Sequence, residues 1–227
     1  MPRETFQRNL DELQDKLLTL GSMVESALLH SVKALKKQDV KAARQLIAQD
    51  RLVNERRHEI EAKALTLIAT QQPAAGDLRT LAAVLEIASE LERMGDYAKG
   101  IANIAVMLGD QPLIKPLIDI PLMAEKGVDM LHRALDAFVR RDVELAVSIP
   151  GQDDEVDGLY NQIYRELVTY IIAEPKNIEQ ANLLLWAAHN LERTADRVTN
   201  ICERVIFTVT GKLVDVGSEN EGIESLG

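Results

Sequence analysis

The chain has 227 residues, of which 46% are hydrophobic and only 4% aromatic, and its net charge is −10 at pH 7. A chain of this length can bury a sizeable core, in one large domain or two smaller ones. The acidic balance argues against a protein that binds nucleic acid or an anionic membrane directly, because both need a basic face. No run of about 18 apolar residues is present, so no transmembrane helix is expected.

The first half of the chain predicts three helices of roughly 30 residues each. A heptad-like apolar seam marks the first helix, which runs to about Lys37. Asp39 is a good N-cap for a second helix, which continues to about Thr70. A proline-containing break over 71–77 ends it, and a third helix then covers about 76–108.

The helical pattern starts again after residues 109–121, which carry three prolines and cannot form one helix. A fourth helix is expected from Leu122 to Arg141, a fifth after the cap at Asp142, and a sixth from Lys176 to about Thr210. Pro150-Gly151 has no counterpart in the first half and should kink or interrupt the fifth helix.

The predicted fold is therefore all-α, a tandem repeat of two three-helix bundles with six long helices. The first repeat covers residues 1–108, a junction covers 109–121, the second repeat covers 122–211, and the acidic tail at 212–227 is expected to be disordered. Cys202 is the only cysteine and the N-terminus lacks an apolar signal region, so we expect a cytoplasmic protein with Cys202 as a small buried hydrophobe.

One acidic motif occurs twice, 100 residues apart. The pattern Leu-Glu-Arg-x-x-Asp stands at 91–96 and again at 191–196. Positions i and i+4 of a helix share a face, so Glu92 lies beside Asp96, and Glu192 beside Asp196. Like charges at this spacing cost an isolated helix about 0.2–0.5 kcal/mol, so the repeated pair indicates a nearby cation.

Further polar residues interrupt the apolar stripes of the second and fifth helices. A buried carboxylate must be paired, exposed or bound to metal, and oxygen ligands favour iron, manganese or magnesium, with zinc as a further alternative. The candidate metal ligands are Asp50, Asn54, Glu92, Asp96, Asp153, Asp157, Glu192, Asp196 and Glu203.

A salt-bridged or solvated role for these acids stays open. Lys99 lies three residues beyond Asp96 and could neutralise the first pair, whereas Thr199 takes that place in the second repeat. Arg93 and Arg193 point about 100° away from the acids, which favours contacts with neighbouring helices or with a partner surface.

The remaining chemistry-bearing residues give weaker signals. His189 lies one turn before Glu192 and is a further candidate ligand, although Ser89 stands in its place in the first repeat. Trp186 and the tyrosines at 160, 164 and 170 sit at helical spacing, which predicts core packing. No glycine-rich phosphate loop, Cys-x-x-Cys motif or nucleophile–base pair is present, so no enzymatic activity is expected.

Two longer motifs extend the doubled acid pair. Gln71-Gln-Pro-Ala-Ala-Gly-Asp-Leu-Arg precedes Glu90-Leu-Glu-Arg-Met-Gly-Asp, and Asn190-Leu-Glu-Arg-Thr-Ala-Asp precedes Asn200-Ile-Cys-Glu-Arg-Val. Together they resemble the PhoU family of bacterial phosphate-transport accessory and regulatory proteins, over about residues 5–212. The resemblance implies a six-helix cytoplasmic protein, commonly a homodimer, that restrains the phosphate-starvation response when phosphate is plentiful.

The same resemblance implies partners and ligands. The implied partners are the ATPase subunit of the phosphate ABC transporter and a membrane sensor histidine kinase; they would supply any peripheral membrane association, and nucleic acid is not among them. Some members bind multinuclear iron or other divalent cations through the acidic motifs, which by position implies the four acids of the doubled motif, faced by Asp50, Asn54, Asp153 and Asp157. Thr194-Ala195 and Asn54 depart from the family pattern, so the first site is expected to be weaker.

Two alternatives remain open on the sequence. A ferritin-like di-iron carboxylate enzyme also keeps acids on bundle helices, but it uses Glu-x-x-His on two helices. Here only His189-x-x-Glu192 is present, single and reversed. A purely structural helical scaffold is the other alternative.

Overall fold

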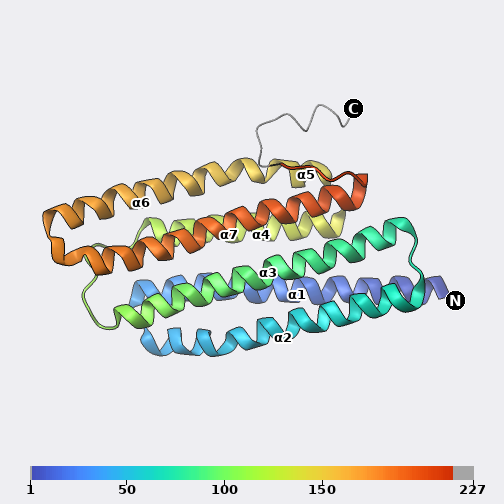
Figure 1. The fold of residues 1–227 in the computed structure, drawn as a ribbon, viewed down its shortest axis with the longest axis horizontal. Coiled ribbons are helices and arrows are strands. Elements are labelled where there is room, and N and C mark those ends of the chain that lie inside the picture. The colour runs from blue at the N-terminus through green and yellow to red at the C-terminus, as the bar shows by residue number, and fades with distance from the viewer. Residues whose placement is uncertain (1, 217–227) are drawn as a thin grey trace.

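The first half of the protein forms three long antiparallel helices (Figure 1). The structure is a computed structural model that describes residues 2–216. The helices are α1 (Pro2–Lys37), α2 (Val40–Gln71) and α3 (Ala75–Leu108). Asp39 caps α2 as predicted, because its carboxylate accepts a hydrogen bond of 2.9 Å from the backbone N–H of Ala42.

The second half repeats this arrangement with one helix interrupted. It contains α4 (Asp119–Arg140), α5 (Val143–Ser148), α6 (Asp153–Ala173) and α7 (Ile178–Thr210). A short 3₁₀ turn that begins at Pro150 separates α5 from α6, so the predicted interruption of the fifth helix is confirmed. The helix α4 begins inside the predicted junction, because Pro121 falls in its first turn, where the missing N–H needs no helical partner.

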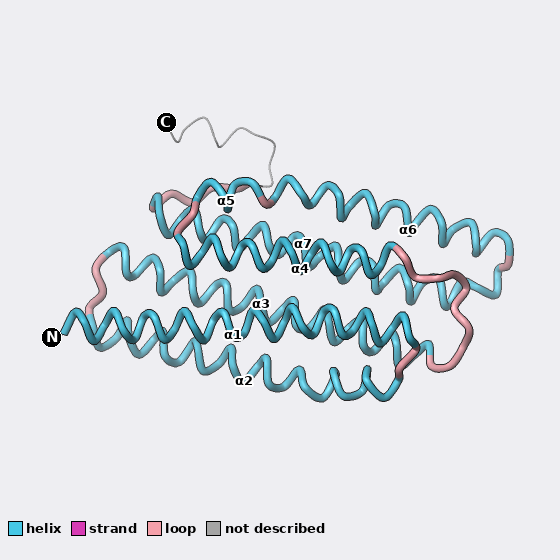
Figure 2. The backbone as a smooth tube through the Cα atoms, turned by 180° about the vertical axis from the view of Figure 1, so that it is seen from behind, coloured by secondary structure: helices cyan, strands magenta, loops and turns pink. Residues whose placement is uncertain are grey.

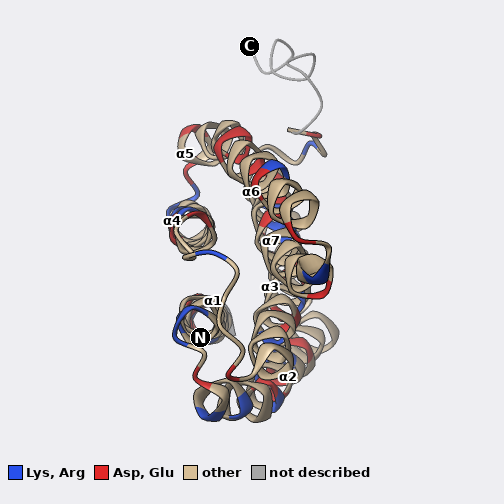
Figure 3. Cartoon of the chain, turned by 90° about the vertical axis from the view of Figure 1, so that its left-hand side faces the viewer, with Lys and Arg blue, Asp and Glu red and all other residues tan. Residues whose placement is uncertain are grey.

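The helices form two rows when the molecule is viewed end-on (Figure 3). One row holds α1 and α4, and the other holds α6, α7, α3 and α2 in that order; α3 and α7 share the most extensive helix–helix contact. The apolar seam of α1 is fully buried at Leu10, Leu13, Leu17 and Leu20, which confirms the predicted core face. The predicted all-α fold of two repeated three-helix units is confirmed.

The turn between α1 and α2 lies at the same end of the first three helices as the start of the junction (Figure 2). The Gln38 side chain, between α1 and α2, donates to the backbone carbonyl groups of Gly109 and Gln111 in the junction. No helix within residues 2–216 is long and apolar enough to cross a membrane.

The expected C-terminal tail is described only in its first residues. Val214 and Val216 pack against the core, and the backbone N–H of Val216 donates to the Glu203 carboxylate at 3.2 Å. This part of the tail therefore lies on the bundle, and the rest of the predicted tail, 217–227, lies outside the described residues.

The prediction that the large aromatic side chains of the second repeat belong to the core is confirmed for Tyr160, which packs against it, and is wrong for Trp186, Tyr164 and Tyr170. Trp186 is 62% exposed, Tyr164 and Tyr170 are exposed, and Tyr160 is half-buried. The inner face of α7 is filled instead by small and aliphatic side chains such as Ala187, Ala188 and Leu191. Helical spacing identifies residues that share a face, but it does not say whether that face points inward.

Candidate functional site

The acids of the first repeat lie between α2 and α3 and are neutralised by a lysine. Asp50 is 7% exposed, and its Oδ2 lies 2.8 Å from Nζ of Lys99. The same ammonium lies 3.7 Å from Oδ1 of Asp96, and Asn54 donates to Asp50 at 3.3 Å. The hydrogen bond to Asp50 holds the pKa of Lys99 above its ordinary value, despite the opposing effect of desolvation. The ammonium of Lys99 thus occupies the position of a cation between α2 and α3.

Glu92 stands apart from this cluster. It is half-buried on α3, and its carboxylate forms no hydrogen bond or ion pair with any of residues 2–216. In the first repeat, Lys99 therefore joins Asp50 and Asp96, Asn54 donates to Asp50, and Glu92 lies outside this cluster.

The second repeat presents the same acids without the lysine. The break at Pro150 makes Asp153 the first residue of α6, where a negative charge is favoured by the helix dipole. Burial is the main cause that raises the pKa of Asp153 to about 7, and the charges of Asp196, Asp157 and Glu192 contribute to the same rise. The Oδ1 atom of Asp153 is buried and has no hydrogen-bond partner among the described residues.

Glu192 on α7 is in a similar position. Burial and the charge of Asp196 raise its pKa, and His189 opposes this effect. Nδ1 of His189 lies 3.1 Å from Oε2 of Glu192, but this oxygen accepts no well-aligned hydrogen bond within residues 2–216. Burial also raises the pKa of Asp157, with Asp196 as the main charged contributor. The second cluster thus carries excess negative charge.

This geometry fits a hydrated cation in the second repeat better than a fully protein-ligated metal. No three His, Cys, Asp or Glu side chains among residues 2–216 are grouped closely enough to hold a metal ion. The buried Oδ1 of Asp153 nevertheless has no hydrogen-bond partner within residues 2–216, and magnesium keeps several waters and needs only one or two carboxylates. In the first repeat, Lys99 already neutralises the acids.

Glu203 is a second candidate ligand that the structure places away from the acidic clusters. Its carboxylate accepts from the backbone of Val216 and lies 3.7 Å from the Arg204 guanidinium. Burial raises its pKa, and the hydrogen bond from Val216 opposes this change. Its contacts therefore tie the start of the tail to α7.

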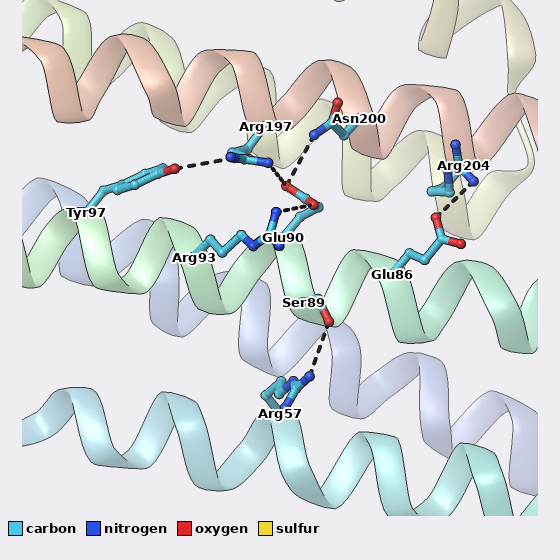
Figure 4. A network of polar contacts seen from close by, with 9 residues as sticks. All are labelled: Arg57, Glu86, Ser89, Glu90, Arg93, Tyr97, Arg197, Asn200 and Arg204. Carbon is cyan, nitrogen blue, oxygen red and sulfur yellow. Dashed lines mark hydrogen bonds and ion pairs between the residues drawn. The ribbon is translucent and has the colours of Figure 1, made fainter. Parts of the chain in front are cut away.

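A polar network that the sequence did not predict joins α3 to α7 (Figure 4). The Glu90 carboxylate accepts from Arg197 and Asn200, at 3.3 Å each. Arg197 also lies 3.4 Å from the Tyr97 hydroxyl, and Arg204 pairs with Glu86 at 2.8 Å. The doubled motif contained a signal for this network. Glu90 and Tyr97 of the first repeat correspond to Asn190 and Arg197 of the second, so the two repeats carry different polar groups at equivalent positions.

The contacts across α3 and α7 follow an approximate two-fold axis. Glu90 meets Asn200 on one side, and their counterparts Asn190 and Gly100 meet on the other. A Cβ atom at Gly100 would lie 3.0 Å from the Asn190 amide nitrogen, so the helices approach closely there. The two halves therefore pack as two subunits of a symmetric dimer would.

The two arginines of the acidic motif take different positions. Arg93 is exposed on α3 and lies 3.4 Å from Glu90. Arg193 of α7 reaches across to α3, where its guanidinium lies 5.5 Å from the Tyr97 ring centroid. Arg193 thus contacts a neighbouring helix.

These features define a class of protein: an all-α chain of two tandem three-helix repeats, each carrying a Glu-x-x-x-Asp pair opposite a polar pair. The PhoU domain matches residues 17–105 and again residues 120–205. The chain therefore belongs to the PhoU family, and the resemblance seen in its sequence is confirmed.

Relatives match along nearly the whole chain. The phosphate-specific transport system accessory protein PhoU homolog of Clostridium acetobutylicum is 37% identical over 217 residues, which cover 95% of this chain and 99% of the relative. The homolog of the same description from Aquifex aeolicus is 36% identical over 91% of this chain and 94% of its own.

Solved structures give the same result. The crystal structure of PhoU from Pseudomonas aeruginosa matches with a TM-score of 0.86 and 33% identity, covering 91% of this chain and 100% of that chain. The phosphate transport system regulatory protein PhoU from Streptococcus pneumoniae matches with a TM-score of 0.85 and 31% identity, covering 92% and 99% respectively.

Proposed function

We propose that this protein is a non-enzymatic regulator of phosphate uptake and of the phosphate-starvation response. The observation that carries the proposal is its similarity, through both repeats, to relatives described as accessory proteins of the phosphate-specific transport system. The chain covers 99% of the Clostridium acetobutylicum relative, so it spans nearly the full length of a protein with that description.

The finer form of the proposal concerns partners. When phosphate is plentiful, the protein restrains the ATPase subunit of a phosphate ABC transporter and a sensor histidine kinase on the cytoplasmic side of the membrane. It acts there as a homodimer. A rigid helical bundle suits this role, because it presents fixed surfaces to its partners.

A gene deletion tests the regulatory proposal. In phosphate-rich medium, the deletion strain is expected to produce starvation-induced phosphatase, and the intact gene supplied in trans should repress it again. Phosphate-starved cultures with and without the gene are the control, because both should produce phosphatase. Phosphatase that stays low in the deletion strain in rich medium would contradict the proposal.

We propose further that the second repeat binds a hydrated divalent cation and that the first binds it weakly. Support comes from the contrast between Lys99, which pairs with Asp50 and Asp96, and Thr199, which cannot pair with the acids of the second repeat. A cation that binds only the folded state adds about 2.7 kcal/mol of stability at a hundred-fold excess over its dissociation constant. Magnesium, manganese and iron all suit oxygen ligands.

Paired variants test the cation site. Chelation should lower the melting temperature of the unmodified protein, and we expect the Asp153→Asn/Asp196→Asn variant to lose this effect. Metal content per chain is measured on the same samples. The matched control is Asp50→Asn/Asp96→Asn in the first repeat, which should keep the effect of chelation. Unchanged metal content in the second-repeat variant would show that these acids are not ligands.

The two other functions make different predictions. A ferritin-like enzyme predicts oxygen-dependent oxidation of bound iron, and a purely structural scaffold predicts that chelation leaves the melting temperature unchanged. Neither predicts phosphatase derepression on deletion. The full-length similarity to transport accessory proteins favours the regulatory function over both.

A further inference from the structure

A group of rings lies on α6 and α7, two of them exposed and two half-buried. We call it the aromatic face; it consists of Tyr160, Tyr164, Trp186 and His189. The His189 ring centroid lies 5.9 Å from that of Trp186 and 6.1 Å from that of Tyr160. Trp186 is 62% exposed, so much of the largest side chain of the face makes no contact within the bundle. Exposed tryptophan and tyrosine side chains are enriched where proteins bind one another.

In the first repeat, the four equivalent positions hold polar residues that have partners within the protein. The equivalents of Tyr160 and Tyr164 are Arg57 and Glu61, and the equivalents of Trp186 and His189 are Glu86 and Ser89. Arg57 pairs with Glu61 at 3.2 Å and donates to Ser89 at 3.5 Å, as Figure 4 shows for the second contact. Glu86 pairs with Arg204 at 2.8 Å. Each of these four polar side chains of the first repeat therefore has a partner, three of them within the repeat and Glu86 on α7.

The second repeat lacks both cations that complete the first. Tyr160 replaces Arg57, and Thr199 replaces Lys99. The carboxylates remain: no lysine or arginine among residues 2–216 forms an ion pair with the four acids of the second repeat, Asp153, Asp157, Glu192 and Asp196. His189 connects the rings to these acids, because it contacts Tyr160, Trp186 and Glu192. The aromatic face thus lies beside an acidic cluster whose one ion-pair partner within residues 2–216 is His189.

We propose that the aromatic face binds a basic segment of a protein partner, with an arginine of that segment stacked on the exposed rings of Trp186 and Tyr164 beside the acids of the second repeat, where the arginine and a divalent cation would compete. A guanidinium stacks on tryptophan and tyrosine rings and pairs with carboxylates at the same time, which matches this combination of rings and acids. The proposal deepens the proposed function and rests on it only in assigning a surface to one of its partners.

Trp186 is the only tryptophan of the chain, so its fluorescence reports on the aromatic face directly. The probe is a blocked twelve-residue peptide with three arginines, and its control carries citrulline at those positions, which keeps the shape and removes the charge. We expect the arginine peptide to change Trp186 emission saturably, with an affinity that falls as salt rises, and the citrulline peptide to have no effect. Equal responses to both peptides, or no response, would overturn the proposal.

Trp186→Glu gives the sharper test, because it installs the residue of the first repeat and adds a negative charge. Non-specific attraction to an acidic protein predicts tighter binding of the arginine peptide by calorimetry, whereas a specific face predicts binding weakened by about 30-fold or more. Met107→Glu is the matched control, since Met107 is 66% exposed on α3 and the same charge is added there. Binding that is unchanged or tighter in Trp186→Glu would refute the proposal.

Two further measurements separate the alternatives. If Mg²⁺ alone shifts Trp186 emission and the arginine peptide does not, the face serves a metal ion and the proposal is wrong. In cells, the Trp186→Glu chain should fail to repress phosphatase in rich medium while folding normally. If deletion of the gene derepresses phosphatase and the Trp186→Glu chain still represses it, the binding surface proposed here is refuted and the regulatory function is not. If deletion itself has no effect on phosphatase, the regulatory function is refuted.

Discussion

Replacing Lys99 with threonine, the residue at the equivalent position of the second repeat, should destabilise the protein and change what the first repeat binds. The Lys99 ammonium is the only cation within residues 2–216 that pairs with Asp50, whose side chain is 7% exposed. Lys99→Thr leaves this buried carboxylate with Asn54 as its side-chain donor. It also gives the acids of the first repeat the uncompensated charge that those of the second repeat have.

The size of the effect follows from the burial of the two partners. A hydrogen bond to a charged group is worth about 1.5–3 kcal/mol, and unpairing a fully buried ion costs more. Lys99 is 37% exposed, so water can replace part of its contact with Asp50. We therefore expect a loss of about 1–2 kcal/mol in the free energy of unfolding. With a urea slope of about 3 kcal/mol per molar, the midpoint should fall by about 0.3–0.7 M.

Urea unfolding with chelator present measures this loss, and Asp50→Asn/Lys99→Thr provides the test of mechanism. Removing the charge of Asp50 should recover about 1 kcal/mol or more relative to Lys99→Thr alone. Lys126→Thr is the matched control, since its ion pair with the exposed Glu155 should be worth less than about 0.5 kcal/mol. A loss in Lys99→Thr no larger than in this control, or no recovery in the double variant, would refute the reasoning. Restored stability of Lys99→Thr on adding Mg²⁺ is also expected.

Three more outcomes follow from the structure. Burial raises the pKa of Asp153 from 3.8 to about 7, so between these values the folded state holds a proton that the unfolded state has released. In chelator, the free energy of unfolding should therefore fall by about 1–2 kcal/mol as pH rises from about 4 to 7, after allowance for solvent screening. Urea midpoints measured across this pH range should show most of this fall disappear in Asp153→Asn. Glu90→Ala should cost about 2–3 kcal/mol in chemical denaturation, because both Glu90 and its partner Arg197 are mostly buried. Glu86→Ala should cost less than about 1 kcal/mol, because Glu86 is exposed and Arg204 keeps Glu203 as a partner; equal losses would contradict this account. Burial raises the pKa of the Cys202 thiol to about 12, so a thiol reagent should label it only as the protein unfolds, and labelling of the native protein at the rate of a free thiol would contradict the burial.

The fold could be predicted because its signals are local and repeated. Heptad spacing placed the core seam of α1, Asp39 and Asp142 set the starts of α2 and α5, and Pro150 set the interruption before α6. Each of these acts through backbone sterics or capping within a few residues. The pairing of Lys99 with Asp96 could be predicted for the same reason, because the two residues lie one helical turn apart in α3.

The site was harder to predict because it depends on contacts between helices distant in sequence. Helical spacing alone grouped Glu203 with Glu192 and Asp196, but in the structure its carboxylate accepts a hydrogen bond from Val216, beyond the end of α7. The outward orientation of Trp186 and the pairing of Glu90 with Arg197, 107 residues away, depend on how α7 packs against its neighbours. No single-helix periodicity contains that information.

The approximate two-fold axis between α3 and α7 has a consequence for how the two halves recognise each other. Glu90 of the first half requires Arg197 and Asn200 of the second, whereas their own counterparts in the first half are Tyr97 and Gly100. Two first halves packed together would give Glu90 no cation from across the axis and leave it Arg93 of its own half, and two second halves would bring Arg197 against Asn190 with no acid. The polar contacts at this axis therefore favour the pairing of a first half with a second half over the pairing of two identical halves.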